Sequence, residues 1–169
     1  MQSTPFPTLR LLFTLAASAL LGACTSAEVR QDSASSIRGL KVSAVSVSST
    51  PSLDPEKHEF MRENDVERYL TSSIRNRLTE TGKLAPTGPT LAVNISSIRV
   101  RSTASAVMWG VMAGPDHLEA NVSVMDKGRT LKTFVAEGSR TSGAFAGPGS
   151  GGRAERLSEE LAIAIVDQL

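Results

Sequence analysis

HLEANVSVMDKGRTLKTFVAEGS, residues 117–139, carries the clearest structural signal in this chain of 169 residues. Apolar and polar residues alternate over residues 117–126, which predicts a β-strand with one buried face. A second strand is expected over residues 131–138. Between them, the sequence DKGR predicts a tight turn in which Gly128 adopts a positive φ. The stretch as a whole therefore predicts an antiparallel β-hairpin.

Two further strands are expected before the hairpin. Residues 91–101 (LAVNISSIRVR) alternate in two phases, and a β-bulge near Ser96 and Ser97 would restore the facing of the second phase. Residues 40–48 (LKVSAVSVS) also repeat with a period of two, with one shift. Two prolines follow this segment and are expected to end the strand.

Two amphipathic helices are expected, one before the second strand and one after the hairpin. The first begins at Pro55 or Asp65 and ends near Thr81. Its apolar residues recur at a spacing of four: Val66, Leu70, Ile74 and Leu78. The last helix is expected over residues 153–168, behind a glycine-rich loop.

The resulting element order, β-α-β-β-β-α, predicts an α+β fold. We expect a two-layer sandwich with a sheet of about four mainly antiparallel strands and two helices on one face. Residues 37–169 would form this single domain. Residues 24–36 are polar and rich in serine, which predicts a flexible tether that has too little apolar surface to fold.

Residues 1–23 have the parts of a secretory signal: a positive charge at Arg10, an apolar run, and small residues at the end. The apolar run is about half of the roughly 20 residues that a spanning helix needs, which favours a cleaved signal. Leu21, Gly22, Ala23 and Cys24 resemble the lipobox of bacterial lipoproteins. This resemblance implies a diacylglycerol on Cys24, cleavage between Ala23 and Cys24, and a further acyl chain such as palmitate. The alternative is an ordinary secreted protein with a cysteine near its cleavage site.

An acylated Cys24 would attach the mature protein to a membrane. Enterobacterial lipoproteins kept in the inner membrane often carry Asp after the cysteine, whereas this chain has Thr25. We therefore expect the outer membrane, with the protein on its periplasmic face, and hold the inner membrane as the alternative. Cys24 is the only cysteine, so the domain has no internal disulfide.

Charge and motifs exclude several classes of function. The chain has 18 basic and 17 acidic residues, and a balanced charge argues against nucleic acid as a partner. The only histidines, His58 and His117, lack cysteine neighbours, so no metal is expected. The glycine-rich loop at 141–152 lacks the Lys-Ser/Thr pair of a phosphate-binding loop, and no Gly-x-Ser-x-Gly elbow is present. We expect neither an enzyme nor a cofactor.

Residues 106–113 (AVMWGVMA) contain too many large apolar groups for a simple loop. Exposed, they would suit a partner, since Trp and Met are enriched at interfaces. The expected interaction surface consists of Met108, Trp109, Val111, Met112 and Phe145. The alternative is that residues 106–113 continue a strand or cover a sheet edge.

These features predict a non-enzymatic interaction or assembly module of the cell envelope, which is tied to the membrane through Cys24. Its partner would be an envelope protein of unknown identity or, in a homo-oligomer, further copies of the chain. A second hypothesis is a carrier of small apolar or lipid ligands, held between the helices and the sheet.

The layout also resembles a family of bacterial lipoproteins that contain the domain of unknown function 4410. The resemblance is carried by the strand LAVNISSIRVR, the hairpin, the glycine-rich stretch and the closing helix with RLSEELAIAIVDQL. The lipobox and the valine-rich first strand also fit. The family has no established activity, so the resemblance implies an organisation and no catalytic residue.

Cys24→Ser removes the thiol that would carry the lipid, so we expect the protein to leave the membrane fraction while its far-ultraviolet circular dichroism stays unchanged. Alkaline or high-salt washing of membranes, followed by immunoblotting, measures the release. If the substituted protein stays in the membrane, an uncleaved signal helix explains the attachment better.

Overall fold

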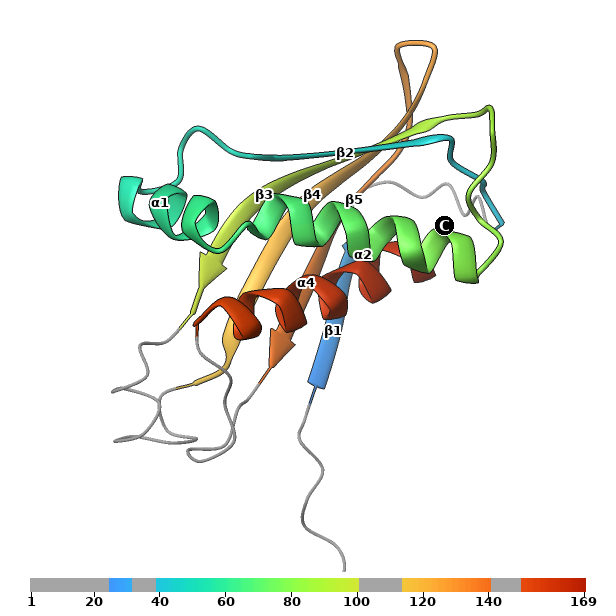
Figure 1. Cartoon of the computed structure of the whole chain (residues 1–169). Helices are drawn as coiled ribbons and strands as arrows, with labels where there is room; N and C mark the ends of the chain where they lie inside the picture. Colours follow the sequence, from blue (N-terminus) through green and yellow to red (C-terminus); the bar gives the residue numbers. More distant parts are fainter. Residues whose placement is uncertain (1–24, 32–38, 101–113, 141–149) are drawn as a thin grey trace, which may run out of the picture.

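One mixed sheet of five strands, in the order β1-β5-β4-β3-β2, forms the centre of the molecule. Helices α2 and α4 lie side by side across one face of this sheet (Figure 1). The computed structural model describes residues 25–31, 39–100, 114–140 and 150–169. The elements are β1 Thr25–Gln31, β2 Ala44–Ser49, α1 Pro55–Glu63, α2 Val66–Glu80, β3 Thr90–Arg99, β4 Asp116–Asp126, β5 Arg129–Arg140 and α4 Ser150–Asp167.

The β4–β5 hairpin forms as the sequence predicts. Its two strands pair antiparallel along their length. Lys127 and Gly128 at the turn have φ values of 48° and 79°. Two consecutive positive values are what a two-residue hairpin turn of type I′ requires. The expected conformation of Gly128 is confirmed.

The bulge that the sequence predicts in β3 is also present. β3 pairs antiparallel with β4, and its register shifts between Ile95 and Ser97. Ile95 and Ile98 are both buried although they are three residues apart. The extra residue, Ser96, is what returns the later part of the strand to the same facing.

The α+β two-layer fold is confirmed, but the sheet is not antiparallel at its β2 edge. β2 and β3 pair parallel, with Ala44 opposite Thr90 and Ser49 opposite Ile95. The segment between β2 and β3 contains both α1 and α2. A helical crossover of this kind joins parallel strands. The other three pairings are antiparallel.

The first predicted helix is two helices. α1 and α2 are separated by Asn64 and Asp65, and Asp65 has a left-handed φ of 50°. The Asn64 side chain donates a hydrogen bond to the Phe60 carbonyl at 2.8 Å, which helps to end α1. Each of the two starts predicted from the sequence, Pro55 and Asp65, therefore lies at the beginning of one helix.

The predicted tether at residues 24–36 is wrong in its first part, because Thr25–Gln31 form the edge strand β1. β1 pairs antiparallel with β5. An edge strand needs hydrogen bonds from only one neighbour and tolerates polar residues, so a serine-containing segment can join a sheet. The ordered domain thus begins before residue 37.

The core lies between the two helices and the sheet. Its most buried large side chains come from every layer: Leu70, Ile74, Leu78, Leu91, Ile95, Leu118, Phe134, Leu157, Leu161 and Ile165. In the described part of the chain, none of the helices combines the length and the apolar character that crossing a membrane requires.

Helix α4 approaches the sheet very closely at Gly138. A Cβ at this position would lie 2.8 Å from Leu161 N and 3.0 Å from Leu157 O. Because both are backbone atoms of the helix, no side-chain rotation could relieve the overlap. The position of α4 on β5 therefore requires a residue without a side chain.

Gly138→Ala should lower the free energy of unfolding by about 1–3 kcal/mol, because α4 must move away from β5 to admit the methyl group. Urea denaturation followed by circular dichroism measures this change. Thr133→Ala, on the same strand but on the opposite sheet face, is the matched control and should change stability by no more than about 0.5 kcal/mol. Equal stability of Gly138→Ala and the parent would contradict the close contact.

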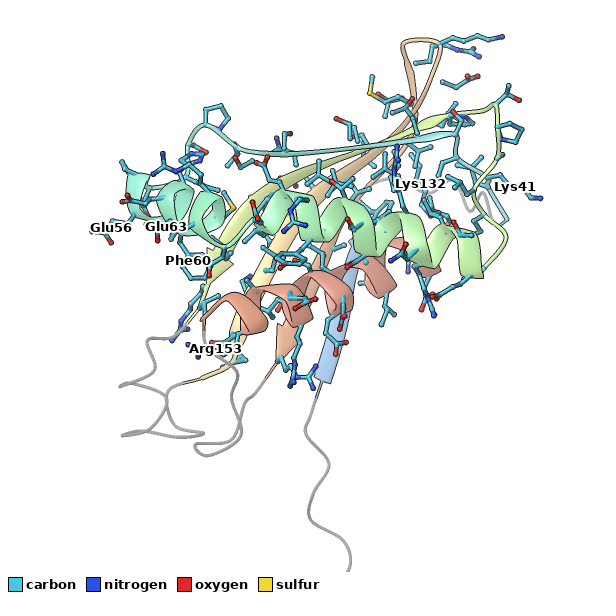
Figure 2. All side chains as sticks on the ribbon, in the orientation of Figure 1. Lys41, Glu56, Phe60, Glu63, Lys132 and Arg153 are labelled. Carbon is cyan, nitrogen blue, oxygen red and sulfur yellow. The ribbon has the colours of Figure 1, made fainter. Side chains whose placement is uncertain are left out.

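Two lysines hold the C-terminal end of α4. Lys83 Nζ donates to Val166 O and Lys132 Nζ donates to Gln168 O, each at 2.7 Å. The last carbonyls of a helix lack donors within the helix and carry partial negative charge, so both ammonium groups suit this position. Burial, together with the nearby charge of Lys83, lowers the pKa of Lys132 below its usual 10.5. Figure 2 labels Lys132 at this end of the molecule.

Lys83→Gln should raise the pKa of Lys132, but not to 10.5, because burial is the larger cause and persists. Titration of the ε-amino resonances by NMR measures this pKa. Lys57→Gln, on α1, is the control and should leave it unchanged. Because the folded pKa lies below that of the unfolded chain, the unfolded chain binds more protons between the two values. Lys132 therefore makes the free energy of unfolding rise with pH in that window. The rise should be smaller in Lys83→Gln than in the parent. A Lys132 pKa that Lys83→Gln does not raise would contradict the assignment.

Candidate functional site

The sheet has a second face, which α2 and α4 do not cover, and which we call the open face. Successive residues of a strand point to opposite faces of the sheet. Leu118 of β4 and Phe134 of β5 are buried in the core, so the residues next to them in each strand lie on the open face. The described residues of these strands on the open face are largely polar: His117, Glu119, Asn121, Ser123, Thr133, Val135 and Glu137.

Three ionisable side chains of the open face form a cluster, which we call the His–Glu cluster: His117, Glu119 and Glu137. One nitrogen or oxygen atom from each lies within 4.8 Å of the others. His117 Nδ1 is 2.9 Å from Glu137 Oε1, and these two side chains are 24% and 21% exposed. The cluster is thus half-buried and still reachable from solvent.

The two glutamates lie directly opposite each other in the β4–β5 register. Like charges in this arrangement repel and destabilise a sheet. His117 opposes this repulsion through its contact with Glu137. The cluster therefore concentrates negative charge on one small area of the open face.

Two bulges create this arrangement. At the turn Asp126 pairs with Arg129, but the register shifts between Val124 and Met125, so Glu119 lies opposite Glu137. Without the shift, Glu119 would lie opposite Ala136. The β3 bulge supplies Ser96, whose hydroxyl donates to Glu119 Oε1 at 2.8 Å. Bulges of this kind often re-aim side chains next to functional sites.

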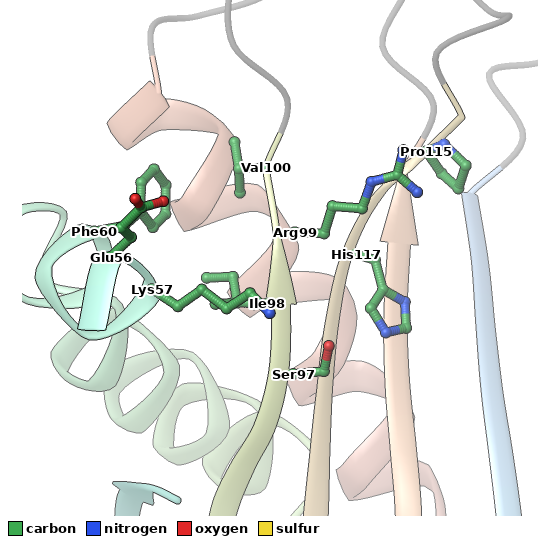
Figure 3. A pocket seen from close by; sticks show the side chains of 9 residues that line it. All are labelled: Glu56, Lys57, Phe60, Ser97, Ile98, Arg99, Val100, Pro115 and His117. Carbon is green, nitrogen blue, oxygen red and sulfur yellow. The ribbon is translucent and has the colours of Figure 1, made fainter. Parts of the chain in front are cut away.

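A cleft of about 580 Å³ lies beside the cluster. It exists because β2 ends opposite Ile95, so the end of β3 runs past its neighbour and lies next to α1. Figure 3 shows Phe60 and Val100 on one side of β3 and Arg99 and His117 on the other. The cleft thus joins an apolar side under α1 to the charged open face. Its lining carries both signs of charge, which suits contact with another molecule's surface.

Ion pairs fasten α4 to this end of the sheet. Arg153 NH1 lies 3.6 Å from Asp116 Oδ2, with both side chains almost fully buried. Arg140 NH1 lies 3.3 Å from Glu160 Oε1. Figure 2 labels Arg153 at the start of the helix. Removing one partner of a buried pair leaves an uncompensated charge, so the Asp116–Arg153 pair holds the start of α4 against β4.

The site residues predicted from the sequence lie outside the described residues. These are Ala23 and Cys24, for cleavage and lipid attachment, and Met108, Trp109, Val111, Met112 and Phe145, for interaction. The predicted interaction residues belong to segments 101–113 and 141–149, and the described residues Asp116 and Arg140, next to these segments, lie close together. Arg140 is opposite Asp116 in the sheet, and Thr25 is opposite Arg140. We call this end of the sheet the anchored end, because the lipid predicted from the sequence would be attached beside it, at Cys24.

The His–Glu cluster was not predicted from the sequence, which placed His117 at the start of a predicted strand and indicated no metal ligand. One signal was present: His117 and Glu119 are two residues apart on a strand and must share a face. Their third partner, Glu137, could not be identified, because its position opposite Glu119 depends on the bulge in the hairpin.

Residues 36–148 match the family described as "Domain of unknown function (DUF4410)". Since the match covers more than half of the chain, the chain belongs to this family, as its layout suggested. No curated protein matches the chain.

The chain is similar to two solved structures, both of PelC dodecamers from Paraburkholderia phytofirmans. One carries a Leu-to-Met substitution, is 16% identical and has a TM-score of 0.43. The other is 14% identical and has a TM-score of 0.42. Each comparison covers 85% of this chain and 96% of the other.

Proposed function

We propose that this member of the DUF4410 family is a lipid-anchored protein on the periplasmic face of the bacterial outer membrane, and that it acts by binding a partner and not by catalysis. In this proposal the signal is cleaved between Ala23 and Cys24. Cys24 then carries the lipid, with palmitate among its acyl chains. The lipobox-like sequence supports the anchor, and Thr25 in place of Asp supports the outer membrane.

The observation that carries the proposal is the register at the anchored end. Thr25, the residue after the proposed lipid site, lies opposite Arg140. Arg140 precedes residues 141–149, and its other neighbour, Asp116, lies three residues after 101–113. The register therefore supports an arrangement in which the lipid and both of these segments are attached at one end of the domain.

The proposed contact surface consists of Met108, Trp109, Val111, Met112 and Phe145. Large apolar groups attached next to a lipid anchor would meet whatever lies at the membrane surface. We propose that they meet another envelope protein or, in a homo-oligomer, further copies of this chain. Trp and Met suit such a contact because they bury much apolar area on binding.

The described ionisable groups favour binding over catalysis. The histidine of the cleft, His117, has its Nδ1 bonded to a carboxylate of Glu137. Nucleophilic catalysis would also need a hydroxyl or thiol in contact with the other ring nitrogen, and the side-chain hydrogen bond of His117 within the described part of the chain is to Glu137. A carrier function for apolar ligands has less support, since the space between the helices and the sheet holds fully buried core side chains such as Ile74 and Leu161.

A charge-substituted variant tests the contact surface. Trp109→Asp combined with Met112→Asp should abolish crosslinking to the partner in intact envelopes, because two carboxylates would have to lose water at the interface. Met125→Asp is the matched control, since Met125 is exposed at the hairpin end of the sheet, far from the anchored end. It should leave crosslinking unchanged. Mass spectrometry of the crosslinked species separates a second copy from a different protein.

Unchanged crosslinking by the double variant would overturn the contact surface. Lipid that co-purifies with the protein and survives native mass spectrometry would favour the carrier function instead.

A further inference from the structure

We propose that His117, Glu119 and Glu137 bind one divalent transition-metal ion, and that Zn²⁺ fits the donors best. The proposal does not depend on the partner-binding function above. It assigns a ligand to the His–Glu cluster, which that function does not use. The donors would be one imidazole nitrogen and two carboxylate oxygens.

The donor chemistry indicates the class of ion. Imidazole favours zinc, copper, iron and nickel, whereas Mg²⁺ and Ca²⁺ prefer oxygen ligands alone. Zinc sites with three protein ligands keep a fourth position for water. The half-buried position of the cluster leaves room for that water from the solvent side.

The distances need only small adjustments. Donors bound to one tetrahedral zinc at about 2.1 Å lie about 3.4 Å apart. His117 Nδ1 and Glu137 Oε1 are 2.9 Å apart, and all three donor atoms lie within 4.8 Å of one another. Small rotations of half-exposed glutamates would bring the three to a common ion. The ion would take the place of the hydrogen bond between His117 and Glu137.

Electrostatics supplies an independent argument for a cation. Glu119 and Glu137 face each other directly across two strands, where their charges repel. The imidazole of His117 contacts Glu137, whereas Glu119 accepts its hydrogen bond within the described part of the chain from the neutral hydroxyl of Ser96. A divalent ion between the carboxylates would turn this repulsion into attraction.

The surroundings of the cluster resemble those of metal ligands. Ser96 Oγ donates to Glu119 Oε1 at 2.8 Å, and a hydrogen bond of this kind orients a ligating carboxylate. Arg99 carries a positive charge that would repel a bound cation, and it pairs with His117 in the β3–β4 register. The Arg99 guanidinium lies against Gly114: its NH2 atom is 3.6 Å from where a Cβ on Gly114 would be. The guanidinium is therefore at the end of the sheet, beyond Glu119.

The test is equilibrium dialysis of the full chain against ZnSO₄. The protein carries Cys24→Ser, which removes the competing thiol, and is purified without a histidine tag. We expect one Zn²⁺ per chain. Glu119→Gln and Glu137→Gln should each weaken Zn²⁺ binding by more than about tenfold. Loss of a hydrogen bond that supports a ligand already weakens metal binding by about that factor, and these variants remove a ligand itself.

His58→Gln is the matched control. His58 is the other histidine of the chain and lines a separate hollow with Asp65 and Glu67, so this variant should bind Zn²⁺ as the parent does. Circular dichroism confirms that each variant is folded. In EDTA, Glu119→Gln should melt at or above the temperature of the parent, since it relieves repulsion. Zn²⁺ should raise the melting temperatures of the parent and of His58→Gln more than that of either glutamate variant.

Two results would overturn the proposal. One is the absence of saturable Zn²⁺ binding by the folded parent. The other is binding that survives Glu119→Gln or Glu137→Gln but is lost in His58→Gln, which would place the ion elsewhere. Lower stability of Glu119→Gln in EDTA would show that the carboxylates do not repel and would remove the electrostatic argument.

Discussion

The contact between α4 and Gly138 is the constraint on which the arrangement of this molecule depends. The helix backbone reaches the strand so closely that a methyl group at Gly138 would overlap Leu161 N and Leu157 O. With its middle set there, α4 places Arg153 beside Asp116 at one end and its last carbonyls beside two lysines at the other. One face of the sheet is thereby sealed, and the other is left for function.

Because strand residues alternate between faces, sealing one face also decides the composition of the other. Burial of Leu118 and Ala120 on β4 obliges Glu119 to point away from the core, next to residues of β3 and β5 on the same side. The stability of the core and the existence of the His–Glu cluster are therefore two consequences of one pairing. A register slip of one residue in β4 would disrupt both.

Much of the fold could be predicted from local patterns, because alternation and helical spacing report which residues are buried. The hairpin, the bulge at Ser96 and the two-layer architecture all follow from such patterns. β1 could not be predicted, since its mostly polar sequence gives a weak strand pattern and its place in the sheet comes from pairing with β5. The His–Glu cluster could not be predicted for a related reason. Glu119 lies opposite Glu137 because of a bulge in the hairpin, and the turn sequence alone does not indicate that bulge.

The anchored end is where these features meet. His117 and Glu119 lie in the part of β4 that begins at Asp116, and Asp116 shares its neighbour Arg140 with the start of β1. A lipid on Cys24 would then be separated from the sheet by no tether, since β1 begins at Thr25. A domain held this close to a membrane has little freedom to reorient. The proposed contact surface would then be held at a nearly constant height, which would favour recognition of a partner in the same membrane over capture of a molecule from the periplasm.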